Sequence, residues 1–226
     1  MLPFTIDCHP PFLVATFFEP QEMLTWSLTH PGRHVARRVA WIEVKNKDLC
    51  EGTDPVTLVR EKLAAADLTD AVALMTSRNI RRHHAAQSVV EEETATCLTT
   101  VGLSNGERVG TRIADPVPLP GTVNTLVHIA RPLSDAAALE TLSVATQART
   151  TAIMDARVER AGRTITGTGT DCIVIAAPQG ADEDRAPFAG LHTPLGEAVG
   201  HAVYHATREG IETWKADFAT MISSET

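Results

Sequence analysis

The sequence predicts an α+β fold: a single domain in which helices cover layers of mixed or antiparallel β-sheet. Three observations favour this class. Hydrophobic residues make up 43% of the 226 residues, enough to bury a core. Strand-like and helix-like segments are mixed along the chain without the strict alternation of a doubly wound parallel sheet. No repeat, low-complexity tract or linker divides residues 1–226, so we expect one domain.

Several segments have the composition of β-strands. Short apolar runs or β-branched residues predict strands at residues 34–46, 71–77, 121–130 and 170–178. Residues 87–103 are rich in Val and Thr and predict one or two more. The sheet is therefore expected to draw strands from the whole length of the chain.

Three helices are predicted from their start signals. Asp54 is placed as an N-cap with Pro55 at the first helical position. Ser134 caps a long Ala-rich helix that we expect to end near residue 156. Thr193 and Pro194 begin a third, C-terminal helix.

Composition narrows the classes of function. The formal net charge of −8 and the 4% of aromatic residues argue against a nucleic-acid partner. No segment approaches the ~20 apolar residues of a membrane span, and the first residues lack the basic start of a signal peptide. The cysteines are far apart in the sequence, at Cys8, Cys50, Cys97 and Cys172. This spacing fits reduced thiols better than a disulfide framework or a zinc ribbon. We therefore expect a cytoplasmic protein that acts on a small molecule, either as a monomer or as a homo-oligomer.

The segment TGTGTD, residues 166–171, stands directly before a buried strand. A phosphate-binding loop would carry a lysine and open a helix, and this segment does neither. One interpretation is a glycine turn whose hydroxyls bond to the backbone. The other is a site in which Gly167 and Gly169 let backbone N–H groups face a substrate. In that site Asp171 accepts a proton or orients a histidine, and Thr168 and Thr170 bind the substrate.

Three further motifs carry polar groups at the ends of predicted elements. His192 precedes a helix start and is either a general base or a surface histidine. Ser104 and Asn105 form either a hairpin turn with the next glycine or a pair of substrate contacts. Asn124 shares one strand face with a histidine that we expect to be a core residue. Thr122 follows a glycine, as at the cleavage point of self-processing threonine hydrolases, or simply begins a strand.

The last predicted helix carries an acid and two histidines at spacings of four: Glu197, His201 and His205. Such a row can bind a metal. An apolar stripe lies roughly opposite it on the same helix, formed by Leu195, Val199 and Val203. We therefore expect the row to be a solvated face and predict no metal site.

Six segments, in the same order, resemble the CbiZ family, the adenosylcobinamide amidohydrolases. They are VALMTS (72–77), TTVGLSNGERVG (99–110), GTVNTLVHI (121–129), LSDAAALETLSVATQARTTAIMDA (133–156), TGTGTD (166–171) and HTPLGEAVGHAV (192–203). The resemblance implies hydrolysis of the amide that joins a corrin propionate side chain to aminopropanol, which would release adenosylcobyric acid for corrinoid salvage. Residues 1–70 depart from the family pattern, which leaves the range of substrates open.

Together, the motifs and the resemblance imply a set of site residues. We expect His192 to act as base or proton shuttle, Asp171 to orient it or the attacking water, and Thr170 to assist. The expected substrate-binding residues are Ser104, Asn105, Thr122, Asn124, Thr168 and Gly169. No cofactor is expected, because the corrinoid is the substrate. Two rivals stay open: a corrinoid-binding module that does not cut its ligand, and a hydrolase of a different amide.

Overall fold

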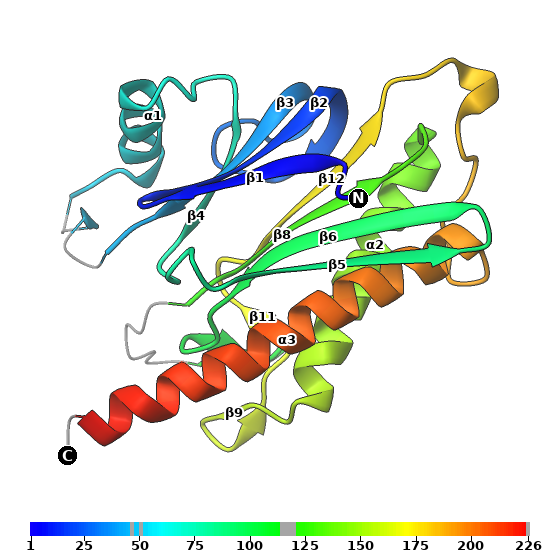
Figure 1. Cartoon of the computed structure of the whole chain (residues 1–226). Coiled ribbons are helices and arrows are strands. Elements are labelled where there is room, and N and C mark those ends of the chain that lie inside the picture. The colour runs from blue at the N-terminus through cyan, green and yellow to red at the C-terminus, as the bar shows by residue number, and fades with distance from the viewer. Residues whose placement is uncertain (46–47, 50–51, 114–120, 225–226) are drawn as a thin grey trace.

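The computed structural model describes residues 1–45, 48–49, 52–113 and 121–224, with side chains through residue 219. It confirms the α+β prediction: a large mixed sheet is covered by helices in one domain (Figure 1). The main strands are β1 Phe4–His9, β2 Phe12–Thr25, β3 Gly32–Glu43, β4 Val72–Thr76, β5 His83–Val90, β6 Glu93–Val101, β8 Val123–Ile129 and β12 Cys172–Pro178. The helices are α1 Pro55–Ala65, α2 Asp135–Asp155 and α3 Pro194–Ser224.

The short elements lie outside the large sheet. They are β7 Gly106–Glu107, β9 Glu159–Arg160, β10 Arg163–Thr164, β11 Gly167–Thr168 and the 3₁₀ turn η2 Asp182–Asp184. β9 pairs with β10, and β11 pairs with β7. The second pairing ties the TGTGTD segment to the segment that contains Asn105.

The large sheet has the order β4-β3-β2-β12-β8-β6-β5, with β1 paired to β2. β12 runs parallel to β8 and β4 parallel to β3, while the other pairs are antiparallel. Two pairs of neighbouring strands, β2 with β12 and β12 with β8, therefore join distant parts of the chain. Because β8 and β12 are parallel, their first residues lie at the same edge of the sheet.

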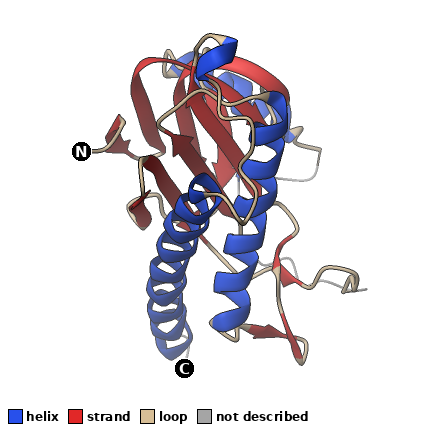
Figure 2. Cartoon of the chain, turned by 90° about the vertical axis from the view of Figure 1, so that its right-hand side faces the viewer, coloured by secondary structure: helices blue, strands red, loops and turns tan. Residues whose placement is uncertain are grey.

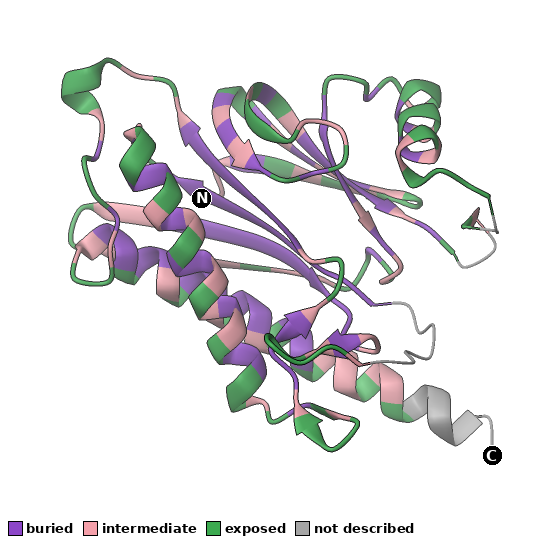
Figure 3. Ribbon diagram, turned by 180° about the vertical axis from the view of Figure 1, so that it is seen from behind, coloured by how far each residue is buried: buried purple, intermediate pink, exposed green. Residues whose placement is uncertain are grey.

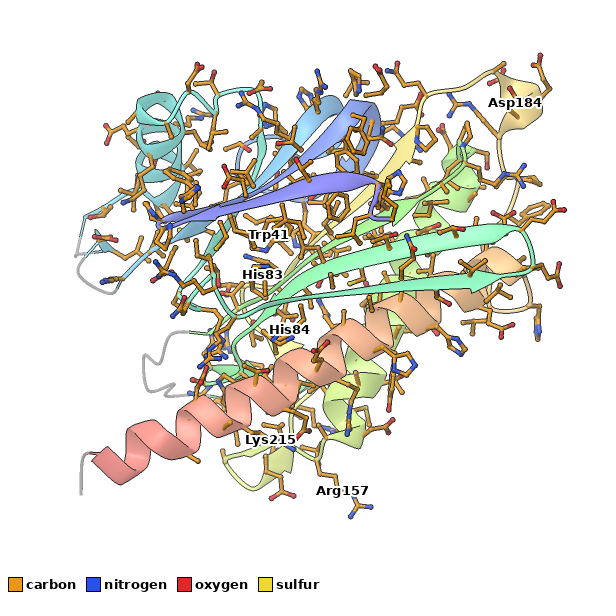
Figure 4. All side chains as sticks on the ribbon, in the orientation of Figure 1. Trp41, His83, His84, Arg157, Asp184 and Lys215 are labelled. Atoms are coloured by element: carbon orange, nitrogen blue, oxygen red, sulfur yellow. The ribbon has the colours of Figure 1, made fainter. Side chains whose placement is uncertain are left out.

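The two faces of the sheet carry separate hydrophobic clusters. On one face, α2 and α3 bury Val127 of β8 and Ile175 of β12, and α1 covers Ile42 of β3. On the other face the sheet folds over itself, so that Trp41 and Leu126 share one cluster although their strands are not neighbours (Figure 4). The central strands β6, β8 and β12 are buried along most of their length, while the outer faces of the helices are exposed (Figure 3).

The helix starts follow the predicted caps. The Asp54 carboxylate accepts from the backbone N–H groups of the first turn of α1. The Ser134 hydroxyl accepts from Ala137 N at 3.1 Å, and the Thr193 hydroxyl accepts from Gly196 N at 2.9 Å. Each side chain satisfies an N–H group that the helix itself leaves unpaired.

Helices α2 and α3 run side by side in the same direction (Figure 2). Near the start of both, the Glu140 carboxylate accepts from Ala189 N at 2.6 Å. Further along, the Tyr204 hydroxyl donates to Asp155 at 2.9 Å. Since α2 follows the last residue of β8, both helix starts lie at the edge of the sheet where β8 and β12 end.

The structure differs from two expectations. Strands β1 and β2 were not predicted, because β2 is irregular between Thr16 and Gln21 and breaks the alternation of apolar residues. His83 and His84 follow two arginines, a pattern typical of an exposed basic loop, but both residues begin β5. The His84 side chain is 11% exposed and lies 3.6 Å from Glu209 of α3 (Figure 4). In the part of the chain described, no helix is long and apolar enough to cross a bilayer.

Candidate active site

The largest concentration of predicted site residues lies in one pocket of about 800 Å³. It opens at the edge of the sheet where β8 and β12 begin, and it is bounded by the end of β2 and by β4. Its polar side is lined by Asn105, Thr122, Asn124, Thr170 and Asp171. The volume suits a small-molecule ligand.

The Asp171 carboxylate fixes the loop that precedes β12. Its Oδ2 accepts from Thr168 N at 2.9 Å, and its Oδ1 accepts from the Thr168 hydroxyl. Oδ1 also accepts from Val123 N, the first residue of β8, at 3.0 Å. The carboxylate therefore joins the starts of two parallel strands. A Cβ on Gly167 would lie 2.7 Å from Oδ2, so this position requires glycine.

Arg149 of α2 supplies the counter-charge. Its Nη1 lies 3.3 Å from Asp171 Oδ2, and the two side chains are only 9% and 7% exposed. Nη1 is within ion-pair distance but is not aligned for a hydrogen bond. The attraction is therefore mainly coulombic, and it acts where little water screens it.

Two hydroxyls meet at the floor of the pocket. The Thr122 and Thr170 Oγ1 atoms are 2.8 Å apart. Both donate to the carbonyl oxygen of Gly121, Thr122 at 2.8 Å and Thr170 at 3.2 Å. The floor therefore concentrates hydroxyl groups around a single carbonyl.

Two side-chain amides leave acceptors unused. Asn124 is 1% exposed, and its Nδ2 donates to Met75 O of β4 at 2.7 Å. Its Oδ1 is buried and has no partner among the described residues. Asn105 Oδ1 is also buried and has no hydrogen-bond partner among the described residues. Because buried polar atoms in native proteins are nearly always paired, these two oxygens point to a ligand that donates hydrogen bonds.

The opposite wall of the pocket is apolar and comes from the N-terminal third of the chain. Trp26 is 46% exposed, and its indole Nε1 donates to Asp171 O at 2.8 Å. Leu28, Leu49 and Leu74 extend this wall. One side of the pocket is therefore suited to a broad apolar surface and the other to a polar arm.

Burial also affects two thiols and one imidazole near the interior. Burial raises the pKa of Cys172, whose Sγ lies 3.6 Å from the Thr25 hydroxyl. Burial likewise raises the pKa of Cys97, and it lowers the pKa of His128 to about 4. At neutral pH all three groups are uncharged, so neither cysteine is present as a thiolate.

A second hollow, of about 780 Å³, lies at the opposite edge of the sheet. Its charged residues already pair with each other: Arg185 with Glu22 at 2.8 Å, and Arg33 with Asp135 at 2.7 Å. These pairs satisfy the groups that a polar ligand would use. The pocket beside Asp171 is therefore the stronger candidate.

The structure brings most of the predicted site residues together. Thr122, Asn124, Asn105, Gly169, Thr170 and Asp171 all line the pocket. Thr168 lies behind it and holds Asp171 in place. Ser104 is adjacent in sequence to Asn105 but does not line the pocket.

His192 does not reach this site. It is exposed and precedes α3, at the edge where β12 ends, whereas Asp171 precedes the first residue of β12. The length of that strand separates the two residues. The expectation that Asp171 orients His192 is therefore wrong, because β12 carries the chain from one edge of the sheet to the other before α3 begins.

The predicted solvated row on α3 has the expected exposure. Glu197, His201 and His205 are exposed, while the stripe on the other side of the helix is buried; its members are Leu195, Val199 and Val203. The described residues contain no group of three or more His, Cys, Asp or Glu side chains that could hold a metal ion.

Sequence reasoning missed Arg149 and Trp26. Arg149 follows Thr141 and Ala145 at helical spacing on the buried face of α2. An arginine within such a stripe of small residues was the available signal that a buried carboxylate lies opposite. Trp26 carried no comparable signal, because it follows a strand whose alternation is broken.

The fold and the described part of the pocket define an α+β protein with a candidate small-molecule site at the edge of its sheet. A sequence profile of the adenosylcobinamide amidohydrolases (CbiZ) matches residues 3–219. The chain therefore belongs to the CbiZ family.

Two individual proteins are also similar to the chain. An adenosylcobinamide amidohydrolase of Halobacterium salinarum is 29% identical over 164 residues, which cover 69% of this chain and 66% of that protein. The crystal structure of the PH0078 protein from Pyrococcus horikoshii OT3 aligns with this chain at 11% identity and a TM-score of 0.47. The alignment covers 93% of this chain and 79% of the PH0078 chain. The second similarity is too low to assign a fold.

Proposed function

We propose that the chain is an adenosylcobinamide amidohydrolase. In this reaction water cleaves the amide between a corrin propionate side chain and aminopropanol, which yields adenosylcobyric acid and the free amino alcohol. The family membership supports the reaction class. The pocket supports the substrate class, since it combines an apolar wall with a polar floor.

The observation that carries the proposal is the unpartnered Asn124 Oδ1 at the polar end of the pocket. A secondary amide has one N–H donor and one carbonyl acceptor. Asn124 Oδ1 is the natural acceptor for that N–H, and the Met75 carbonyl fixes the orientation of the Asn124 side chain. A substrate held in this way would place its carbonyl beside the Thr122 and Thr170 hydroxyls.

The floor supplies the groups that amide cleavage requires. The Thr170 hydroxyl is placed to donate to a developing oxyanion, as it now donates to Gly121 O. Thr122 offers a hydroxyl nucleophile. Asp171 serves as a positioning residue, because its oxygens already accept from the Thr168 and Val123 backbones.

The apolar wall would receive the ring. Trp26 presents an exposed indole at the pocket edge and is bonded to the backbone of Asp171. A flat macrocycle gains most from contact with such a surface. The propionate arm would then extend past Trp26 to the floor.

The test is to incubate the pure protein with adenosylcobinamide and to measure aminopropanol and the corrinoid acid by mass spectrometry. Asn124→Leu should lower the rate about 100-fold, since a buried hydrogen-bonding group is removed. His201→Ala, on the exposed face of α3, is the control and should retain full activity. Full release by Asn124→Leu would contradict the proposal. Tight binding without release would favour the rival corrinoid-binding module.

A further inference from the structure

Among the described residues that line the pocket, none is a free base next to the Thr122 and Thr170 hydroxyls. The ionisable side chains among the described lining residues are Lys45, Asp171 and Cys172. An ammonium group such as that of a lysine offers no lone pair for a proton, and the Cys172 thiol is kept neutral by burial. Both Asp171 oxygens accept hydrogen bonds within the protein and face the Arg149 guanidinium. None of these groups is free to take a proton from Thr122.

The peptide bond between Gly121 and Thr122 is held in a reactive arrangement. The Thr122 Oγ1 lies 2.8 Å from the Gly121 carbonyl oxygen, so the hydroxyl contacts the peptide group that precedes its own residue. Thr170 donates to the same carbonyl oxygen at 3.2 Å and so polarises it. A nucleophile and an oxyanion donor thus flank one backbone carbonyl.

The residue before this bond must be glycine. A Cβ on Gly121 would lie 2.5 Å from Asn105 Oδ1 and 3.0 Å from both Asn105 N and Gly102 O. Contacts of that length to backbone atoms exclude any side chain. The glycine therefore lets the carbonyl approach Asn105 and Thr170 closely.

The residues after the bond are fixed independently of it. Gly102 N donates to Thr122 O at 3.0 Å, and Val123 N donates to Asp171 Oδ1 at 3.0 Å. Both bonds belong to the start of β8. They would keep Thr122 at the pocket floor even if its own amide bond were broken.

We propose that the chain cleaves itself between Gly121 and Thr122, and that the released α-amine of Thr122 is the catalytic base. The Thr122 Oγ1 attacks the Gly121 carbonyl carbon, the C–N bond breaks, and the hydroxyl proton passes to the Thr122 nitrogen. This step leaves an ester between Gly121 and Thr122. Water then hydrolyses the ester to a Gly121 carboxylate and a free Thr122 hydroxyl, so that one water is consumed in all.

The second half of the inference rests on the proposed function. An α-amine has an ordinary pKa of about 8, close to neutral pH. In the cleaved chain it would belong to the same residue as the nucleophile and would take the Oγ1 proton during attack on the substrate amide. It would then return that proton to the nitrogen of the leaving aminopropanol. Water would hydrolyse the resulting Thr122 ester and release the corrinoid acid.

The unpartnered Asn105 Oδ1 fits the same arrangement. It is buried beside Gly121 and has no hydrogen-bond donor among the residues that the structure describes. A new amine at Thr122 brings N–H donors to this part of the floor. Asn105 is therefore a positioning residue for the amine as well as a boundary of the pocket.

The experiment follows the intact mass of the purified full chain during incubation at neutral pH. We expect conversion to two fragments that stay associated, residues 1–121 and 122–226, with Thr122 as the new N-terminal residue. Hydroxylamine should speed the cut and leave a Gly121 hydroxamate, because it attacks the ester. An intact chain that releases aminopropanol would overturn the self-cleavage and leave the proposed function standing. A cut chain that releases no aminopropanol would support the self-cleavage and overturn the proposed function.

Matched variants separate self-cleavage from a contaminating protease. Thr122→Val keeps the shape of the side chain but lacks the hydroxyl, and it should remain uncut. Thr122→Ser should be cut, and Thr170→Val should be cut about 100-fold more slowly. Cleavage of Thr122→Val at the same bond would overturn the proposal. If Thr122→Val fails to fold by circular dichroism, the Ser and Thr170 variants decide the outcome.

Discussion

The Arg149–Asp171 pair offers the sharpest test of how the site is held together. Replacing Arg149 by Met leaves a buried carboxylate without its counter-charge, a change that typically costs about 3–5 kcal/mol. Asp171 keeps its bonds from the Thr168 and Val123 backbones. The pair also lacks an aligned hydrogen bond. We therefore expect a loss of about 3 kcal/mol in the free energy of unfolding, at the lower end of that range.

Urea denaturation measures this loss. The series is made in the Thr122→Val background so that the chain stays intact. The midpoint of Arg149→Met should fall by about 1 M urea. In the double variant with Asp171→Asn, the loss should be smaller than the sum of the two single losses, since neither charge remains.

The control for this series is an exposed ion pair. Arg33 pairs with Asp135 at 2.7 Å, with side chains 43% and 88% exposed. Arg33→Met should cost less than about 1 kcal/mol, because solvent screens the pair. If the free energy of unfolding of Arg149→Met lies within about 0.5 kcal/mol of its parent, the reasoning is refuted. A buried carboxylate that loses its counter-charge should destabilise the fold by more than this.

Three more outcomes follow from single contacts. The pKa of His128 is lowered to about 4 in the folded protein, so the unfolded chain takes up the proton first and stability falls as the pH drops from about 6.5 towards 4. The loss at pH 4.5 should be about 2.5 kcal/mol in urea titrations, and His128→Leu should remove it. Gly167→Ala would set a Cβ 2.7 Å from Asp171 Oδ2 and should lower the melting temperature, whereas Gly169→Ala, with open space around it, should change it little. Trp26→Ala should raise the KM for the corrinoid about tenfold with little change in kcat, and an unchanged KM would remove Trp26 from the binding wall.

The local chemistry of the chain predicted the helices and most of the central strands. The caps at Asp54, Ser134 and Thr193 depend on neighbouring residues alone, and they bond as expected. The strands β8 and β12 are short apolar runs, so each could be assigned as a strand from its own residues, without knowledge of the strands it pairs with. The N-terminal strands were not predicted, because the register of β2 shifts between Thr16 and Gln21 and three exposed residues interrupt its alternation there.

The site was predictable in its parts but not in its assembly. Thr122, Asn124, Thr170 and Asp171 were found because they stand directly before, or at the start of, buried strands. Which strand starts share an edge depends on the parallel pairing of β8 with β12, which is a property of topology. The same topology sends His192 to the other edge. No spacing along the chain reveals that separation.

The Asn124–Met75 hydrogen bond joins two regions with different roles, since β8 carries the polar floor and β4 adjoins the apolar wall. Under the proposed function, the reacting groups would come from residues 105–171, and the surface that selects the ring would come from residues 26–77. Mutation in the N-terminal third can therefore alter ligand preference while the chemistry persists. Divergence among relatives would then accumulate in that third first, and transplanting it between homologues would be a direct route to enzymes with new corrinoid specificity.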